Sequence, residues 1–127
     1  MHNSSLPPRS HPKLPLIFWE WLGGVVDGDG HFRLVHKGGR QGEMTLEMGV
    51  VDEALLRYIQ TSLGYGSTQK MKGAKGKGTL RLVISRGADF DHLAAHVGGH
   101  IHHQGRRAQL AAVLQERGQP LPPRKLR

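Results

Sequence analysis

The chain has 127 residues, enough for one modest domain with a single core. Eighteen Lys and Arg against ten Asp and Glu give a formal net charge of +8, which points to a polyanionic partner. The sequence contains no cysteine, which excludes a disulfide framework and a cysteine-ligated zinc or iron–sulfur site.

The two ends of the chain differ in composition from its centre. Residues 1–13 are polar, proline-rich and aperiodic, which predicts a flexible N-terminal arm. Residues 118–127 form a basic, proline-rich C-terminal tail. We therefore expect one domain over residues 14–117.

The first predicted element is a helix over residues 16–26, which is apolar almost all round. This pattern predicts a helix that is buried on most of its surface. It is too short for a membrane span, which needs roughly 20 residues, and we expect no membrane partner. Trp19 and Trp21 in this helix are interpreted as core or interface anchors.

Two predicted hairpins follow, each with a helix after it. Residues 31–37 and 43–51 form the first hairpin around the glycine-rich turn 38–42, and Asp52 is expected to cap a helix that runs to residue 63. Residues 67–71 and 79–86 form the second, followed by helices over 89–97 and 104–117. This order predicts an α+β fold, an antiparallel sheet with helices on one face.

The polar and basic residues of these hairpins predict contacts with nucleic acid. Six basic residues and no acidic residue lie between Ser67 and Arg86, which fits either a solvated hairpin or, as the net charge favours, an arm along phosphates. The polar face of the first hairpin could read base edges in a major groove. Its glutamates fit either base readout or cross-strand pairing with Arg33 and Lys37.

The stretch from residue 22 to residue 30, Leu-Gly-Gly-Val-Val-Asp-Gly-Asp-Gly, presents carboxylates at the end of the first helix. Gly23 and Gly24 each cost about 1 kcal/mol of helix stability relative to Ala, and close approach of another helix would compensate. A carboxylate in this place suits a hard divalent cation such as Mg²⁺.

This stretch closely resembles the LAGLIDADG motif of the homing endonucleases, with Gly23 in place of the usual alanine. The order of elements extends the resemblance over roughly residues 14–117. It implies an αββαββα fold with a saddle-shaped sheet, and a homodimer with the motif helix at its interface. The expected interface residues are Trp19, Leu22, Gly23 and Val26.

The resemblance also implies an activity, a site-specific double-strand DNA endonuclease that leaves 3′ overhangs at a long pseudo-palindromic site. Asp29 and the Gly28 carbonyl would hold Mg²⁺, or Mn²⁺ or Ca²⁺ in its place, and Asp27 would have a structural role. The family usually has a lysine before the last long helix, where this chain has Gln104, the second expected catalytic residue. The expected DNA-binding residues are Arg33, Val35, Lys37, Arg40, Gln41, Glu43, Thr45, Glu47, Gln69, Lys70, Lys72, Lys75, Lys77, Arg81 and Arg106.

Other interpretations stay open at this point. A non-catalytic intron RNA maturase or a DNA-binding protein would share the fold, whereas a general RNA-binding protein would explain the charge but not the motif helix. His92 and His96 have the spacing of a zinc site, but we favour surface histidines near phosphate. No secretory or targeting segment is evident, which fits an organelle (mitochondrion or chloroplast) or a prokaryotic cytoplasm.

Overall fold

A computed structural model describes residues 11–36, 40–49, 52–72 and 78–125 of the chain. Its elements follow the order predicted from the sequence, with one short 3₁₀ helix in addition. They are α1 (Leu16–Asp29), β1 (Gly30–His36), β2 (Arg40–Gly49), α2 (Glu53–Leu63), β3 (Ser67–Lys72), β4 (Gly78–Ile84), α3 (Gly87–Val97), η4 (Gly98–His100) and α4 (Gln104–Glu116).

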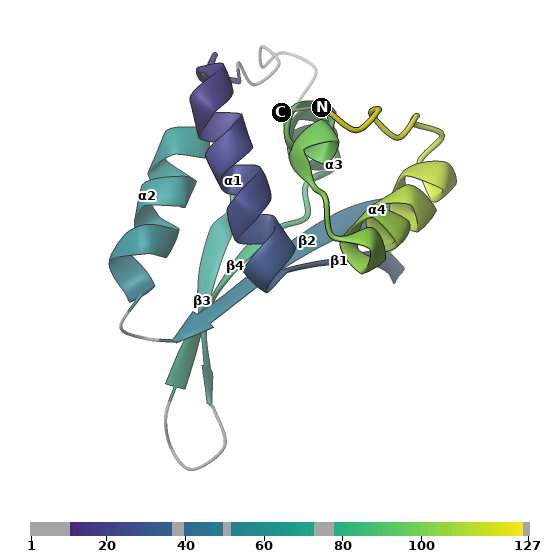
Figure 1. Ribbon diagram of the computed structural model, residues 1–127. Coiled ribbons are helices and arrows are strands. Elements are labelled where there is room, and N and C mark those ends of the chain that lie inside the picture. Colours follow the sequence, from purple (N-terminus) through teal and green to yellow (C-terminus); the bar gives the residue numbers. More distant parts are fainter. Residues whose placement is uncertain (1–10, 37–39, 50–51, 73–77, 126–127) are drawn as a thin grey trace, which may run out of the picture.

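The four strands form one antiparallel sheet in the order β1-β2-β4-β3. The helices lie on one face of this sheet, which confirms the predicted α+β class (Figure 1). The strands alternate as expected, so that Met44, Leu46 and Leu82 are buried toward the helices. The opposite face, called the outer face below, is not covered by any helix among the described residues (Figure 1).

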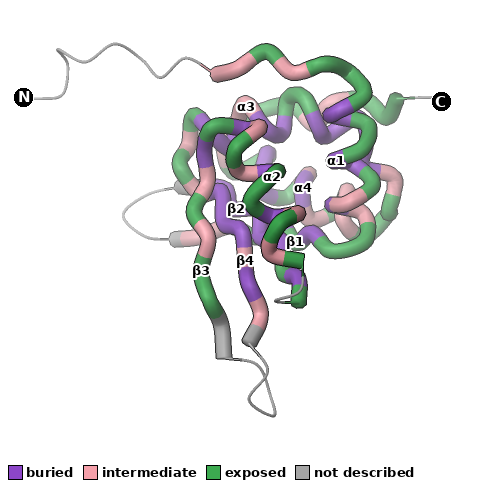
Figure 2. Tube along the Cα trace, turned by 90° about the vertical axis from the view of Figure 1, so that its left-hand side faces the viewer, coloured by how far each residue is buried: buried purple, intermediate pink, exposed green. Residues whose placement is uncertain are grey.

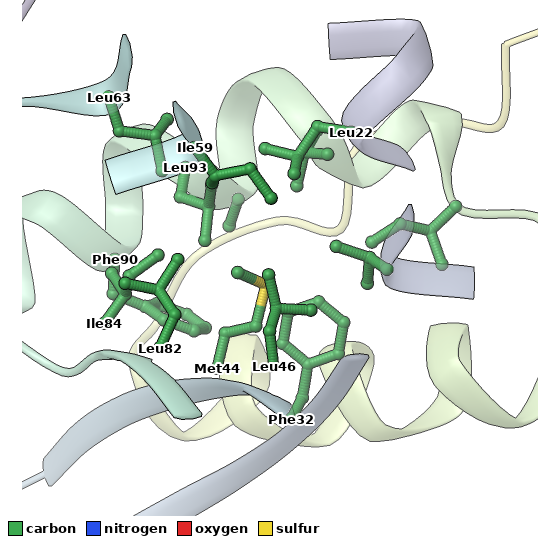
Figure 3. Close-up of a cluster of buried hydrophobic side chains, with 14 of the residues drawn as sticks. Leu22, Phe32, Met44, Leu46, Ile59, Leu63, Leu82, Ile84, Phe90 and Leu93 are labelled. Carbon is green, nitrogen blue, oxygen red and sulfur yellow. The ribbon is translucent and has the colours of Figure 1, made fainter. Parts of the chain in front are cut away.

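The hydrophobic core fills the space between the sheet and the helices (Figure 3). Leu22 of α1, Ile59 of α2, Leu93 of α3 and Phe32 of β1 all contribute side chains that are at most 2% exposed. Burial of such side chains stabilises the fold by roughly 1.5–3 kcal/mol each.

The helix α1 is buried on one side only, which corrects the expectation that most of its surface is covered. Leu22 and Val26 are fully buried, whereas Leu16 is 63% exposed and Ile17 is 73% exposed. Buried and exposed segments accordingly alternate along this helix (Figure 2). The apolar residues of its exposed side therefore do not belong to the core of this chain.

The helix α2 begins without a side-chain cap and ends at a glycine. Asp52 stands at its N-cap, but the side chain makes no capping hydrogen bond, so the expected cap is not formed. Glu53 instead pairs with Arg57 one turn later, at 2.8 Å. Gly64 ends the helix in the left-handed conformation (φ 78°), which glycine adopts without steric cost.

The described parts of the predicted arm and tail pack against the domain. His11 contacts Asp89 of α3 at 2.9 Å. At the other end, the Lys125 N–H donates to the Gly99 carbonyl (2.7 Å) and the Arg107 guanidinium donates to the Pro122 carbonyl (3.0 Å). None of the helices described is long and apolar enough to span a bilayer.

Candidate active site and nucleic-acid interface

The carboxylate of Asp29 lies at the junction of α1 and β1, where the motif helix ends and the sheet begins. Asp29 is exposed, and it borders a hollow of about 120 Å³ that opens beside the outer face. The other lining residues come from three strands, and they are His31, Arg33, Thr45, Glu47 and Arg81. The structure thus brings Asp29 together with four of the residues expected to contact DNA.

Asp27, two residues earlier, points elsewhere and has a structural role, as expected. Its carboxylate accepts hydrogen bonds from the backbone N–H groups of His102 (2.9 and 3.1 Å) and His103 (2.9 Å). These residues directly precede α4. The bonds therefore fix the start of α4 against the end of the motif helix.

Gln104 opens α4 and is exposed. Its neighbour His103 caps the helix, because the ring nitrogen Nδ1 accepts a hydrogen bond from the Arg106 N–H (3.2 Å). Arg106 is half-buried, and it does not line the hollow beside Asp29. The link through Asp27 thus holds Gln104 near the end of α1, whereas Arg106 lies apart from the hollow.

Two cross-strand ion pairs occupy the outer face. Arg33 Nε of β1 donates to Glu43 Oε2 of β2 at 2.6 Å, and the two residues are directly opposite in the sheet register. Arg81 Nη2 of β4 donates to Glu47 Oε1 of β2 at 3.3 Å, again between opposite residues. Both glutamates are thus paired across the strands, Glu43 with Arg33 and Glu47 with Arg81, whereas Lys37 lies outside the described residues.

Thr45 lies between the two ion pairs along β2 and is 6% exposed. Its hydroxyl is buried with no hydrogen-bond partner among the described residues. Because an unpartnered buried hydroxyl costs about 1–3 kcal/mol, such groups commonly bind water or a ligand. The Thr45 hydroxyl in the hollow beside Asp29 could thus donate a hydrogen bond to a bound molecule or accept one from it.

His31 is a lining residue that the sequence interpretation missed. It is exposed and lies opposite Thr45 in the register. Strand alternation places it on the same face as Arg33, two residues later. That alternation, starting directly after the motif, was the signal that could have identified it.

The remaining expected DNA-binding residues do not all lie on the outer face. Val35 and Gln69 belong to the outer face by alternation, half-buried and exposed respectively. Lys70 alternates to the helix side, opposite the buried Leu80. The pKa of Glu53 in α2 is lowered mainly by its hydrogen bond with Arg57, and the charge of Lys70 lowers it a little further. Residues Lys37, Lys75 and Lys77 and the side chains of Arg40, Gln41 and Lys72 lie outside what the structure describes.

The expected interface residues of α1 are covered by the chain itself. Trp19 is 3% exposed, and Leu22 and Val26 are fully buried in the core. A Cβ atom added to Gly23 would lie 2.5 Å from the carbonyl oxygen of His100, so this glycine lets η4 cross α1 closely. Gly24 faces open space instead. The close helix contact expected at the glycine pair is thus made at Gly23 by a helix of the same chain.

The histidines of α3 pack against aromatic rings, with His92 half-buried and His96 exposed. The His92 ring stacks on His11 at 4.3 Å, and its Nδ1 lies 2.9 Å from the Tyr65 hydroxyl. His96 stacks on Trp19 at 5.0 Å. Burial, together with the charges of His11 and His96, lowers the pKa of His92 to about 4.

Among the residues that the structure describes, His92 and His96 have no third ligand of the kind that a zinc site needs. Within the described ranges, no group of three or more His, Cys, Asp or Glu residues could hold a metal ion. Asp29 supplies one carboxylate per chain, and the carbonyls at the end of α1 supply neutral oxygens. This donor set fits Mg²⁺ or Ca²⁺ in chemical type, but one chain alone provides too few ligands.

The sequence is similar to intron-encoded proteins of yeasts. Over 96 residues, the chain is 32% identical to the intron-encoded RNA maturase bI4 of Saccharomyces cerevisiae and to a probable intron-encoded endonuclease, aI2, of Debaryomyces hansenii. These matches cover 76% of the chain but only 14% of each relative's length. No model of a known protein family matches the sequence.

Solved structures of homing endonucleases have the same fold. I-CvuI in complex with its DNA target in the presence of Ca²⁺ superposes with a TM-score of 0.63 at 22% identity, over 79% of this chain and 65% of that one. The LAGLIDADG meganuclease I-CpaMI bound to uncleaved DNA gives 0.62 at 16% identity, over 81% of this chain and 35% of that one. I-TnaI gives 0.59 at 17% identity, over 84% and 77%.

The motif at the end of α1 and the shared architecture identify the chain as a protein with the LAGLIDADG homing endonuclease fold. It carries this fold's motif once, and its sequence relatives include an intron-encoded RNA maturase and a probable intron-encoded endonuclease.

Proposed function

We propose that the protein is a homodimeric, divalent-metal-dependent endonuclease that cuts both strands of DNA at a long, pseudo-palindromic site and leaves 3′ overhangs. The observation that carries this proposal is the place of Asp29. Its exposed carboxylate ends the motif helix and borders a polar hollow beside the outer face of the sheet. That face would bind the duplex, and the net charge of +8 would favour it electrostatically.

The dimer would form through the exposed side of α1 rather than through the residues first expected there. Ile17, Trp21, Gly24 and Gly28 follow helical spacing along that side, and we call them the exposed stripe. Outside the backbone of α1 itself, no described atom lies within 4 Å of a Cβ added to Gly24 or Gly28, so a second backbone could approach closely there. A two-fold axis along the stripe would bring two Asp29 carboxylates together and would demand a roughly palindromic site.

The pair of Asp29 carboxylates, with the Gly28 carbonyls as helpers, would hold Mg²⁺, Mn²⁺ or Ca²⁺. A cation bound there would activate water for in-line attack on the phosphodiester and stabilise the leaving 3′ oxygen. Gln104 would orient a phosphate oxygen from the start of α4, because the bonds of Asp27 hold that helix end near α1. The outer-face residues would fix the register of the duplex.

A non-catalytic maturase or DNA-binding role is the second candidate. Two observations favour it, the maturase bI4 among the relatives and Gln104 where homing endonucleases usually have lysine. The cell compartment would be the same in either case, an organelle or a prokaryotic cytoplasm in which an intron-encoded protein is made.

A cleavage selection tests the two candidates. Palindromic duplexes with randomised half-sites are incubated with the protein and Mg²⁺, and the cut ends are sequenced in parallel with Asp29→Asn. We expect enrichment of one symmetric site with wild type and none with the variant, which should still bind that site. Selective retention of intron RNA or DNA without any cutting would favour the non-catalytic role and contradict the nuclease.

A further inference from the structure

The two ion pairs of the outer face have opposite exposures. In the first pair, the Arg33 side chain is 53% exposed and the Glu43 side chain is 10% exposed. In the second pair, the Glu47 side chain is 56% exposed and the Arg81 side chain is 19% exposed. One pair thus presents a guanidinium to solvent above a buried carboxylate, and the other presents a carboxylate above a mostly buried guanidinium.

We propose that these pairs are two base-reading positions of opposite chemistry, with Arg33 reading a guanine and Glu47 reading a cytosine in the DNA major groove. Glu43 and Arg81 would not contact bases but would hold the reading side chains in place. This assignment rests on the proposed DNA-binding function, and it names the bases that the outer face would select.

The geometry of the first pair favours guanine. Glu43 Oε2 accepts from Arg33 Nε at 2.6 Å, which uses one of the five N–H donors of the guanidinium. The planar group is thereby oriented, while the donors on its two Nη atoms can still bind another partner. Guanine alone presents two acceptors, O6 and N7, in the major groove, and arginine contacts them in a bidentate manner.

The second pair presents acceptors instead of donors. Arg81 Nη2 donates to Glu47 Oε1 at 3.3 Å, and a carboxylate has acceptor sites for further partners. Cytosine offers the N4 amino group in the major groove, which glutamate accepts. Arg81 also balances the negative charge of Glu47, which would otherwise be repelled by the phosphates.

The sheet sets the separation of the two positions. Glu43 and Glu47 are four residues apart on one strand, which is roughly 13 Å at roughly 3.3 Å per residue. At roughly 3.4 Å per base pair, the guanine and the cytosine would lie several base pairs apart in each half-site. A two-stranded ribbon fits the major groove of B-form DNA, whereas the major groove of A-form RNA is too narrow for side-chain readout.

A binding selection with the full chain tests this assignment without requiring cleavage. Palindromic duplexes with randomised half-sites are selected in Ca²⁺, and base preferences are compared between wild type, Arg33→Gln, Glu43→Met and Glu47→Gln. Glutamine contacts adenine in a bidentate manner. We therefore expect Arg33→Gln to change one guanine preference to adenine, and Glu47→Gln to change one cytosine preference to adenine, at different positions. Glu43→Met should weaken the guanine preference about tenfold and leave the cytosine unchanged.

The matched control is Glu53→Gln, which breaks the exposed pair with Arg57 on α2, away from the outer face. It should leave every base preference unchanged, and thermal unfolding of each variant verifies that it is folded. A wild-type site whose base preferences do not respond to Arg33→Gln or Glu47→Gln would overturn this assignment and leave the proposed DNA binding intact. Selection of no DNA sequence by the wild type would overturn both.

Discussion

The carboxylate of Asp27 accepts a hydrogen bond from the backbone N–H of His102 at 2.9 Å, so the end of the motif helix holds the segment that starts α4. A second bond, from the His103 N–H, has the same length. The two acidic residues of the motif thus have separate tasks, because Asp27 binds the backbone of this chain whereas Asp29 faces the hollow.

We expect Asp27→Ala to lower the free energy of unfolding by about 2–3 kcal/mol, because two backbone N–H groups would lose a charged acceptor. Asp29→Asn, at an exposed position, should change it by less than about 0.5 kcal/mol. Urea denaturation of the two variants beside wild type measures both values. Equal losses would contradict the division of tasks between the two residues.

The two glycines of the motif should respond differently to alanine. At Gly23 the new Cβ would lie 2.5 Å from the His100 oxygen and 2.6 Å from the His100 Cβ, so η4 must shift. We expect a loss of about 1–3 kcal/mol. At Gly24 the new Cβ would meet no described atom outside the backbone of α1, and alanine should gain up to about 1 kcal/mol from helix propensity. Thermal unfolding of the two variants and of wild type, at one low protein concentration, measures these changes in stability.

The exposed stripe provides a separate test of the dimer. Gly24→Leu should separate two facing α1 helices and raise the dimer dissociation constant at least about tenfold without unfolding the chain. Sedimentation at a series of protein concentrations measures this constant, and Ala95→Leu on the exposed part of α3 is the matched control. Unchanged association of Gly24→Leu would place the interface elsewhere.

Stability should fall as the pH is lowered through the range set by His92. The pKa of His92 is about 4 in the folded chain, below its ordinary value of 6.5, because burial and the charges of His11 and His96 disfavour protonation. Between pH 6.5 and 4 the unfolded chain therefore binds a proton that the folded chain does not, so stability decreases as the pH falls. Urea midpoints from pH 7 to 4 should show this decrease, and His92→Gln should reduce it. An identical pH profile for His92→Gln would contradict this assignment.

Gln104→Lys should increase the rate of DNA cleavage, because a cation at the start of α4 would stabilise the negative charge that develops on the scissile phosphate. We expect about tenfold or more, measured under single-turnover conditions on the selected site. Gln115→Lys, at an exposed position near the other end of the same helix, adds the same charge and should leave the rate unchanged. Equal acceleration by both variants would indicate general charge attraction rather than a local effect.

Local patterns in the sequence predicted the elements because each depends on nearby residues. Alternation of Met44, Leu46 and Met48 marked β2. The glycine-rich turn after residue 26 predicted the end of α1 too early, because the helix continues to Asp29. The nine-residue motif pointed to Asp29 and to the fold, which the solved homing endonuclease structures share. Alternation also assigned Arg33 and Glu47 to one face.

The sequence could not decide which groups would meet across the fold. Glu43 could have contacted a base or a basic neighbour, and only the register with Arg33 placed it beneath that side chain. The presence of Gly23 in a helix predicted a close neighbour without identifying it. That neighbour is His100, 77 positions away in the chain. Lys70 follows the alternation to the helix side, where it lies near Glu53.

Local structure and tertiary contacts depend on different physical ranges along the chain. Periodicity and turn chemistry act over a few residues, so the sequence alone determined the type of each element and the order of the elements. Partners far apart in the chain are brought together only when the sheet and helices pack. The tertiary structure therefore decided which side of α1 stays exposed and which carboxylate faces the hollow.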